Sequence, residues 1–371
     1  MGSGHSKLRI AVSNCSMNRD MRTSFTRPGA LSGGSGGLIC PTGGVLQRPS
    51  GRSAFRRRSS LARSPGAVPK AWLALLCCAL ASFRCDARLN VVATTPDLGS
   101  IASAVGGNKI DVTVLVRPTE DPHFVDPKPS FVVKLNRADV LIEGGAELEL
   151  GWLPSLLQSA RNSKIAKGAP GRVVANEGIK MLEVPVSLDR SKGDIHAAGN
   201  PHYLVDPENA LIVARHIARA LAAVDPESSA AYESNLAEFT ASLQTALQEW
   251  KRKLEPFRGR SLVGFHNSWP YFANRFEFKI DIYLEPKPGV PPTPAHLAEV
   301  ITTMKERRAA VILVDTYQDR RTAEAVASRT GATVLDVSHF PGGMKGTEAG
   351  YIAFMNRLVD SLATALAAKA D

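Results

Sequence analysis

DPESSAAYESNLAEFTASLQTALQEWKRKLEPF, residues 225–257, is the stretch that decides the fold. Its first two residues, Asp225 and Pro226, are typical of a helix start, because Asp caps free N–H groups and Pro fits the first turn. No helix breaker follows before Pro256, so the pattern predicts about 30 helical residues, roughly 45 Å long. A flexible linker would be rich in Gly, Ser or Pro instead. We therefore expect a rigid helix that connects two other parts of the chain.

Short apolar strand patterns alternate with helical patterns on both sides of this helix. The clearest strand patterns are LNVVATT (89–95), DVLIEGG (139–145), SLVGFH (261–266) and AAVILVD (309–315). Alternation of strands and helices predicts parallel sheets with helices on both faces. We expect an α/β fold of two βα lobes with mainly parallel sheets, residues 88–224 and 258–371, joined by the long backbone helix 225–257.

The net charge separates a basic leader from a near-neutral body. The chain has 45 Lys+Arg and 35 Asp+Glu, a net charge of +10. Residues 1–87 hold 13 of the basic and 2 of the acidic residues, which leaves 32 basic and 33 acidic residues in the body. All five cysteines also lie before residue 88. The body therefore has no disulfide and no thiolate ligand, and we expect no nucleic-acid partner.

The leader divides into two predicted segments. Residues 1–69 are rich in Gly, Ser and Arg and lack apolar periodicity, which predicts disorder. Lys70 and the apolar run AWLALLCCALASF (71–83) are typical of a secretory signal peptide, residues 70–87, because about 13 apolar residues are too few to span a bilayer. We expect cleavage near Arg88 and a periplasmic protein.

Two further expectations concern the leader. A signal so far from Met1 favours a start codon downstream, at Val68, in which case residues 1–67 are a mis-annotated start. A lipoprotein would need a tripeptide of small residues before a cysteine, and the SFR tripeptide before Cys85 fits this poorly. We therefore expect a secreted protein rather than a lipid-anchored one.

Three histidines of the body lie where predicted strands or loops end. His123 lies in DPHFVDP (121–127) and His202 in NPHYLVDP (200–207), and both loops have Pro-His, a short spacer and Asp-Pro. In each loop we expect the Asp that follows the histidine, Asp126 or Asp206, to cap a helix whose first turn holds the next Pro. His266 ends the strand pattern SLVGFH. Because strand ends line the ligand crevice of an open α/β sheet, these imidazoles are expected to meet.

A fourth group should come from a later strand of the second lobe. Asp336, in ATVLDVS (332–338), is the best candidate. Three neutral imidazoles and one carboxylate form a nitrogen-rich tetrahedral set that suits Zn²⁺. The alternative is that the three are unrelated loop histidines. Carboxylates such as Asp121 or Asp126 would support the ligands from behind.

Taken together, several segments resemble one family. The two Pro-His loops, GFHNSWPYFANRFEF (264–278), EPKPGVPPTPAHLAEVI (285–301) and the long helix are similar to the cluster A-I solute-binding proteins, the metal receptors of bacterial zinc and manganese ABC importers. The resemblance implies that a metal is clamped between two lobes and passed to a membrane permease. It places the family's three histidines on His123, His202 and His266. Histidine at the third position resembles zinc receptors, and glutamate there resembles manganese receptors.

The chain departs from the family pattern in two places. Asp336 lies earlier in its strand than the family's last ligand, so His339, Asp315 and water are alternatives for the fourth position. Many zinc receptors also carry a long His-rich loop before the second histidine. Here residues 183–199 contain only His196, and we expect a plain surface loop.

The resulting expectation is a monomeric periplasmic receptor, not an enzyme, that captures Zn²⁺ and delivers it to an ABC permease. Mn²⁺ is the alternative cargo, and a manganese or iron receptor is the alternative within the family. A zinc hydrolase is the alternative from another class, but the sequence has no His-Glu-x-x-His helix, no Gly-x-Ser-x-Gly elbow and no Walker loop. A surface adhesin would need an anchor at the outer surface.

Overall fold

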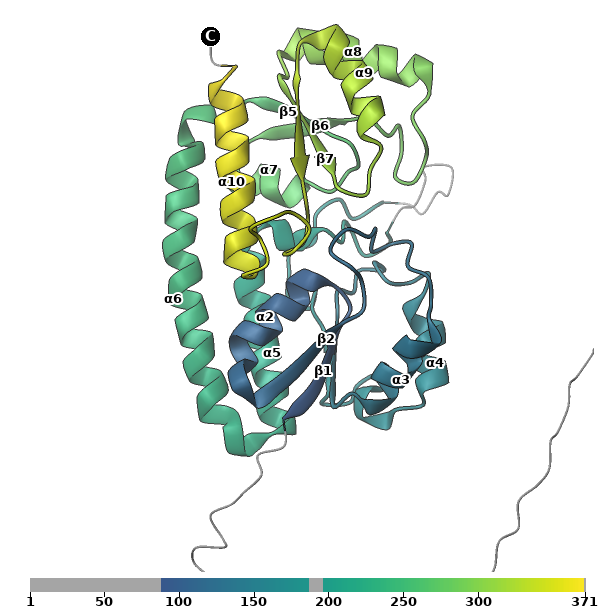
Figure 1. The fold of residues 1–371 in the computed structure, drawn as a ribbon, viewed down its shortest axis with the longest axis vertical. Helices are drawn as coiled ribbons and strands as arrows, with labels where there is room; N and C mark the ends of the chain where they lie inside the picture. Colours follow the sequence, from purple (N-terminus) through teal and green to yellow (C-terminus); the bar gives the residue numbers. More distant parts are fainter. Residues whose placement is uncertain (1–87, 187–195, 370–371) are drawn as a thin grey trace, which may run out of the picture. The chain divides into compact units, whose positions relative to one another are not determined.

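The computed structural model describes residues 88–186 and 196–369. The predicted leader, residues 1–69, and the predicted signal peptide, residues 70–87, lie outside the described residues. Within the described part, the chain forms two four-stranded parallel sheets covered by helices (Figure 1). The predicted α/β class with two lobes is therefore confirmed. None of the described helices is both long and apolar enough to cross a membrane.

The first lobe is built on a sheet with the strand order β2-β1-β3-β4. Its strands are β1 (Leu89–Ala93), β2 (Ile110–Val114), β3 (Val140–Glu143) and β4 (Arg172–Val174). Its helices are α2 (Pro96–Gly106), α3 (Pro129–Arg137), α4 (Leu153–Ala160) and α5 (Pro207–Val224), with short 3₁₀ turns at Gly107–Lys109, Ser163–Ile165 and Tyr203–Val205. The central strands β1 and β3 are apolar and buried, as expected for a sheet covered on both faces.

The second lobe repeats this architecture with the strand order β6-β5-β7-β8. Its strands are β5 (Ser261–Gly264), β6 (Lys279–Tyr283), β7 (Val311–Asp315) and β8 (Thr333–Val337). Its helices are α7 (Pro270–Phe276), α8 (Pro294–Arg307), α9 (Arg320–Thr330) and α10 (Tyr351–Ala367). Every strand pair in both sheets is parallel, so the carboxyl ends of the strands in each lobe face one way.

The connecting helix is α6 (Ser229–Leu254), flanked by 3₁₀ turns at Pro226–Ser228 and Glu255–Phe257. It runs past both sheets, with α10 beside it (Figure 1). Its buried side chains recur at helical spacing; they are Tyr232, Phe239, Leu243, Leu247, Trp250 and Leu254. The helix has no glycine or proline in its interior, which agrees with a rigid connection.

Two hydrogen bonds attach α6 to helices of both lobes. The side-chain amide of Asn235 donates to the Val105 carbonyl at the end of α2, at 2.9 Å. The Trp250 indole donates to the Asn356 side chain on α10, at 2.7 Å. A single apolar core extends from β1 through α6 to α10. The lobes therefore share a core, and their relative position depends on packing as well as on the connection.

The buried indole of Trp250 predicts a large loss of stability on truncation. Trp250→Ala removes a fully buried side chain and its hydrogen bond, and we expect the free energy of unfolding to fall by about 3–5 kcal/mol. Urea unfolding followed by circular dichroism measures this change. Glu249→Ala, on the exposed face of the same helix, is the control and should change stability by less than about 0.5 kcal/mol. Equal effects of the two substitutions would contradict the packing described.

Candidate metal centre

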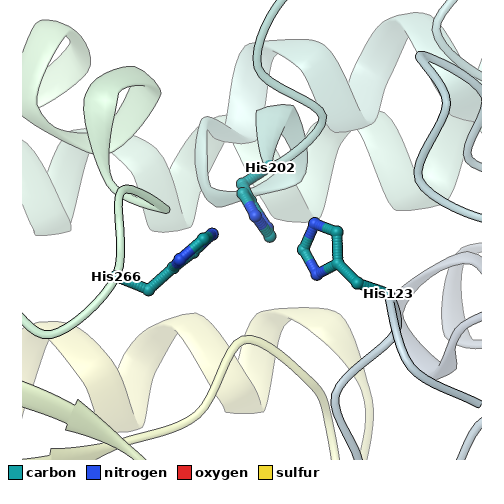
Figure 2. A group of neighbouring side chains, drawn as sticks. All are labelled: His123, His202 and His266. Atoms are coloured by element: carbon teal, nitrogen blue, oxygen red, sulfur yellow. The ribbon is translucent and has the colours of Figure 1, made fainter. Parts of the chain in front are cut away.

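Three loops from the two lobes carry the histidines of the site. His123 lies between β2 and α3, His202 lies just before the turn Tyr203–Val205, and His266 follows β5. Their side chains point toward a common centre (Figure 2). One ring nitrogen of each lies within 4.8 Å of those of the other two, which is close enough for all three to bind a single metal ion.

The helix-cap expectation holds for one Pro-His loop and fails for the other. The Asp206 carboxylate accepts a hydrogen bond from the Glu208 amide and caps α5, with Pro207 in the first turn. In the other loop, α3 begins only at Pro129, after Lys128, and has no side-chain cap. Pro129, two residues after Pro127, offers an equally good helix start.

Carboxylates support two of the three imidazoles from behind. Asp121 Oδ1 lies 2.8 Å from His123 Nδ1, and Glu285 Oε2 lies 2.7 Å from His266 Nδ1. When the carboxylate accepts the Nδ1 proton, the Nε2 lone pair is left facing the centre, which is the arrangement that orients metal-binding histidines. The Nε2 atoms of His123 and His202 are buried without a hydrogen-bond partner in the described part of the chain.

Sequence reasoning found one of these carboxylates and missed the other. Asp121 supports a ligand as expected, whereas Asp126 is exposed and has no contact with the histidines. Glu285 lies just beyond the end of β6, the strand paired with β5. The available signal was its position near the carboxyl end of the strand pattern KIDIYLEP (279–286). The pairing of that strand with the His266 strand was not visible in the sequence.

Burial keeps the His202 ring in the neutral form that can bind a metal. Desolvation, followed by the neighbouring imidazoles, lowers the pKa of His202 well below its ordinary 6.5. Burial raises the pKa of Asp121, but the side-chain and backbone hydrogen bonds from His123, together with the charge interactions with His123 and His266, outweigh burial and lower that pKa below the ordinary 3.8. At neutral pH the site therefore pairs a neutral His202 ring with an ionised carboxylate behind His123.

The structure does not bring Asp336 to the three histidines. Its side chain is 56% exposed and forms an ion pair with Arg320 at the start of α9. The next residue, Val337, is buried, and successive side chains of a strand point to opposite faces. Asp336, the predicted fourth group, therefore lies on the exposed face of β8, away from the three histidines.

The two protein alternatives for the fourth position are paired with each other. His339 Nδ1 lies 2.8 Å from Asp315 Oδ1, and His339 Nε2 lies 3.3 Å from the Ser268 carbonyl oxygen. Both partners are acceptors, so the ring needs a proton on each nitrogen. Burial lowers the pKa of His339, but the Asp315 carboxylate outweighs it and raises that pKa above 6.5. A ring in this state has no lone pair for a metal.

A fourth imidazole lies at the edge of the cluster. The ring centroid of His196 is 5.3 Å from that of His123, compared with 5.1 Å for His202. Burial and the neighbouring imidazoles lower the pKa of His196 to about 4. It lines a cavity of about 420 Å³ together with His123 and His266. The sequence indicated only a surface loop here, because the fold alone brings this residue back to the first Pro-His loop.

Two parallel α/β lobes spanned by one long helix, with histidines from both lobes converging between them, define a class of two-lobed metal-binding receptors. The family model described as ZnuA, zinc-uptake complex component A, periplasmic, matches residues 91–365. The chain belongs to this family of metal ABC transporter substrate-binding proteins. The resemblance seen in the sequence is therefore confirmed.

Individual relatives differ in the metal that their names carry. The iron ABC transporter substrate-binding lipoprotein MtsA of Streptococcus pyogenes serotype M1 is 26% identical over 287 residues, which cover 76% of this chain and 89% of that protein. The manganese lipoprotein PsaA of Streptococcus mitis is 26% identical over 289 residues, with coverages of 76% and 90%. A crystal structure of a zinc-bound ZnuA deletion mutant is 27% identical with a TM-score of 0.64, and the match covers 75% of this chain and 98% of that chain.

The carboxylate behind His123 predicts an effect on metal affinity. Asp121→Asn keeps the size of the side chain but replaces the ionised acceptor of the ring proton, and we expect zinc affinity to fall about 10-fold to 100-fold. Competition titration with a chelating dye measures this change. Asp126→Asn, in the same loop and exposed, is the matched control. Affinity that falls equally in both variants, or in neither, would contradict a supporting role for Asp121.

Burial of His202 predicts acid sensitivity in the metal-free protein. Its folded pKa lies below the ordinary 6.5, so its contribution to the free energy of unfolding is present above about pH 6.5 and lost as pH falls toward the folded value. We expect the metal-free wild type to lose more thermal stability between about pH 7.5 and about pH 5 than His202→Gln does. Thermal unfolding at both pH values measures the difference. Identical losses would show that this ring is not held neutral by burial.

Proposed function

We propose that this chain is an extracytoplasmic receptor that captures Zn²⁺ between its two lobes, through His123, His202 and His266, and delivers it to the permease of an ABC importer. The observation that carries the proposal is the convergence of three ring nitrogens within 4.8 Å of one another. The membership of the chain in a family of transporter receptors supports the role of the ion as cargo.

The donor set favours zinc over manganese. The cluster of candidate ligands found in the described residues contains three imidazoles and no carboxylate. Imidazole nitrogen suits Zn²⁺, whereas carboxylate and water oxygens suit Mn²⁺. The relatives named for iron and manganese make those metals the alternatives for this chain. Relative affinities for the three metals decide between them.

We assign the fourth coordination position to water. Asp336 is engaged with Arg320 at the surface, and Asp315 and His339 bind each other. The cavity beside His123 and His266 has a volume of about 420 Å³, ample for water at an open coordination position. Such an exchangeable position suits a cargo ion, which must leave its site again.

Two carboxylates that contact the ligand rings, but not the ion itself, balance the charge of the bound ion. Three neutral imidazoles leave the full +2 charge of zinc, and the carboxylates of Asp121 and Glu285 lie on the far side of two of the rings. These two negative charges stabilise the ion without occupying its coordination positions. Because α6 is a rigid connector and the lobes share a core, we expect release by movement of the ligand loops rather than by wide hinge opening.

The same comparisons support a proposed location outside the cytoplasm. The family description is periplasmic, and two relatives are named lipoproteins. We propose a periplasmic protein that begins near Arg88 after removal of the signal peptide. Attachment by a lipid on Cys85 is the alternative, and mass spectrometry of the mature N-terminus distinguishes the two. We also propose a monomer and no nucleic-acid partner.

Metal analysis of the full chain tests the proposed function. We expect one zinc per chain and a loss of affinity of at least about 100-fold in each of His123→Ala, His202→Ala and His266→Ala, because each removes a direct ligand. Calorimetric titration measures the affinities. Asp336→Ala is the control and should bind as the wild type does, since its carboxylate lies in a surface ion pair. Wild-type affinity in the triple histidine variant would overturn the proposal.

A further inference from the structure

A single carboxylate joins the loops that carry His202 and His266. Glu183 Oε2 accepts a hydrogen bond from the side-chain amide of Asn200, at 3.0 Å, and another from that of Asn267, at 2.8 Å. Asn200 lies two residues before His202, and Asn267 immediately follows His266. Each asparagine therefore belongs to the loop of one proposed ligand, and the loops come from different lobes.

Additional hydrogen bonds of Asn200 join these contacts into a continuous path between the two loops. The Asn200 amide also donates to the backbone carbonyl of Asn267, at 2.8 Å. On its other side, Asn200 Oδ1 accepts a hydrogen bond from the backbone N–H of His202, at 3.0 Å. Asn200 is only 7% exposed, so water competes little for these bonds. The path runs from the His202 backbone through Asn200 to the residue beside His266.

The backbone of Glu183 is itself held in place. The N–H of the preceding Leu182 donates to the Tyr271 hydroxyl, at 2.9 Å, and that hydroxyl donates to the Asn200 carbonyl, at 2.8 Å. The Asn200 N–H in turn donates to the Leu182 carbonyl, at 2.9 Å. Glu183 has a φ of 54°, in the left-handed region that non-glycine residues seldom adopt. Such a conformation persists only where its surroundings specify it.

Glu183 reaches the proposed ligands only through the asparagines. No hydrogen bond joins its carboxylate to a histidine ring among the described residues, although it lines a cavity of about 400 Å³ with His202 and His266. Its influence on the metal centre is therefore expected through the position of the two loops.

We propose that Glu183 is a positioning residue that holds the His202 loop and the His266 loop at the separation that zinc binding needs. The inference rests on the proposed function of the three-histidine centre. While Glu183 keeps its hydrogen bonds to Asn200 and Asn267, the rings are already placed before the ion arrives, so binding requires little reordering of the two loops. Without these hydrogen bonds, the two loops move independently, and a bound ion loses one ligand more often. The expected consequence is faster dissociation of the metal.

A pair of substitutions at Glu183 separates positioning from charge. Glu183→Ala removes the acceptor, and we expect zinc to dissociate about 10-fold faster, in the range seen when a support of a metal ligand is removed. Glu183→Gln keeps a carbonyl oxygen that accepts both amide hydrogen bonds, and we expect it to restore a nearly wild-type rate. Stopped-flow transfer of zinc from the full chain to a chelator measures the rates. Glu177→Ala, an exposed glutamate in the same region of the chain, is the control.

A double-mutant cycle tests the route through Asn267. If Glu183 acts through that side chain, the effect of Glu183→Ala on the dissociation rate should largely disappear in an Asn267→Ala background. Thermal unfolding of the metal-free variants identifies any that fail to fold, and only folded variants are compared.

Three results would overturn the inference. They are an unchanged rate in Glu183→Ala, a Gln variant as fast as the Ala variant, and fully additive effects in the cycle. A wild-type chain that binds no zinc would instead overturn the proposed function. A wild type that binds zinc with an unaffected Glu183→Ala variant would overturn the positioning role alone.

Discussion

The proposed metal centre depends on holding three imidazoles from two lobes, one buried and two half-buried, within 4.8 Å of one another. Without an ion, the arrangement is costly, because the Nε2 atoms of His123 and His202 are buried with no partner in the described structure. It persists because contacts elsewhere fix each loop. Carboxylates orient two of the rings, and the backbone carbonyls two residues before and two residues after His202 accept hydrogen bonds from Tyr271 and Tyr351. We therefore interpret the unsatisfied nitrogens as a feature of the proposed binding site rather than as a packing defect.

The proposed site also requires that the two lobes keep a fixed relative position. The apolar core that they share provides it. Helix α6 is bonded to α2 of the first lobe and to α10 of the second. Tyr351, the first residue of α10, donates its hydroxyl to the Leu204 carbonyl at 2.6 Å, two residues after His202. Its backbone N–H donates to the Ser100 hydroxyl on α2. The C-terminal helix thus supports a ligand loop of the other lobe, and the histidine separation is coupled to the core.

The carboxylates near the ends of β7 and β8 are already paired with basic side chains, so the ligands that we propose are imidazole nitrogens. The two acidic side chains near the ends of the last strands are both occupied, Asp336 by Arg320 and Asp315 by His339. The Asp315–His339 pair is almost fully buried, and breaking it would leave a charge without a partner in a low-dielectric interior. Neither carboxylate is therefore free to bind a metal. The ligands that we propose are therefore imidazoles, and this donor set is our reason for proposing zinc rather than manganese.

The sequence by itself determined the α/β class, the long connecting helix and the three histidine loops. These follow from local patterns, namely strand and helix periodicity, the absence of a helix breaker between Pro226 and Pro256, and prolines beside His123 and His202. The predicted start at Asp225 was early, because a 3₁₀ turn, Pro226–Ser228, precedes α6 at Ser229. Only the tertiary structure decided which face of β8 carries Asp336, the support of His266 by Glu285, and the contact of Glu183 with both ligand loops. These features join residues far apart in the chain and depend on side-chain direction, so no local spacing encodes them. A strand end could be predicted from pattern, but the partners of its side chains could not.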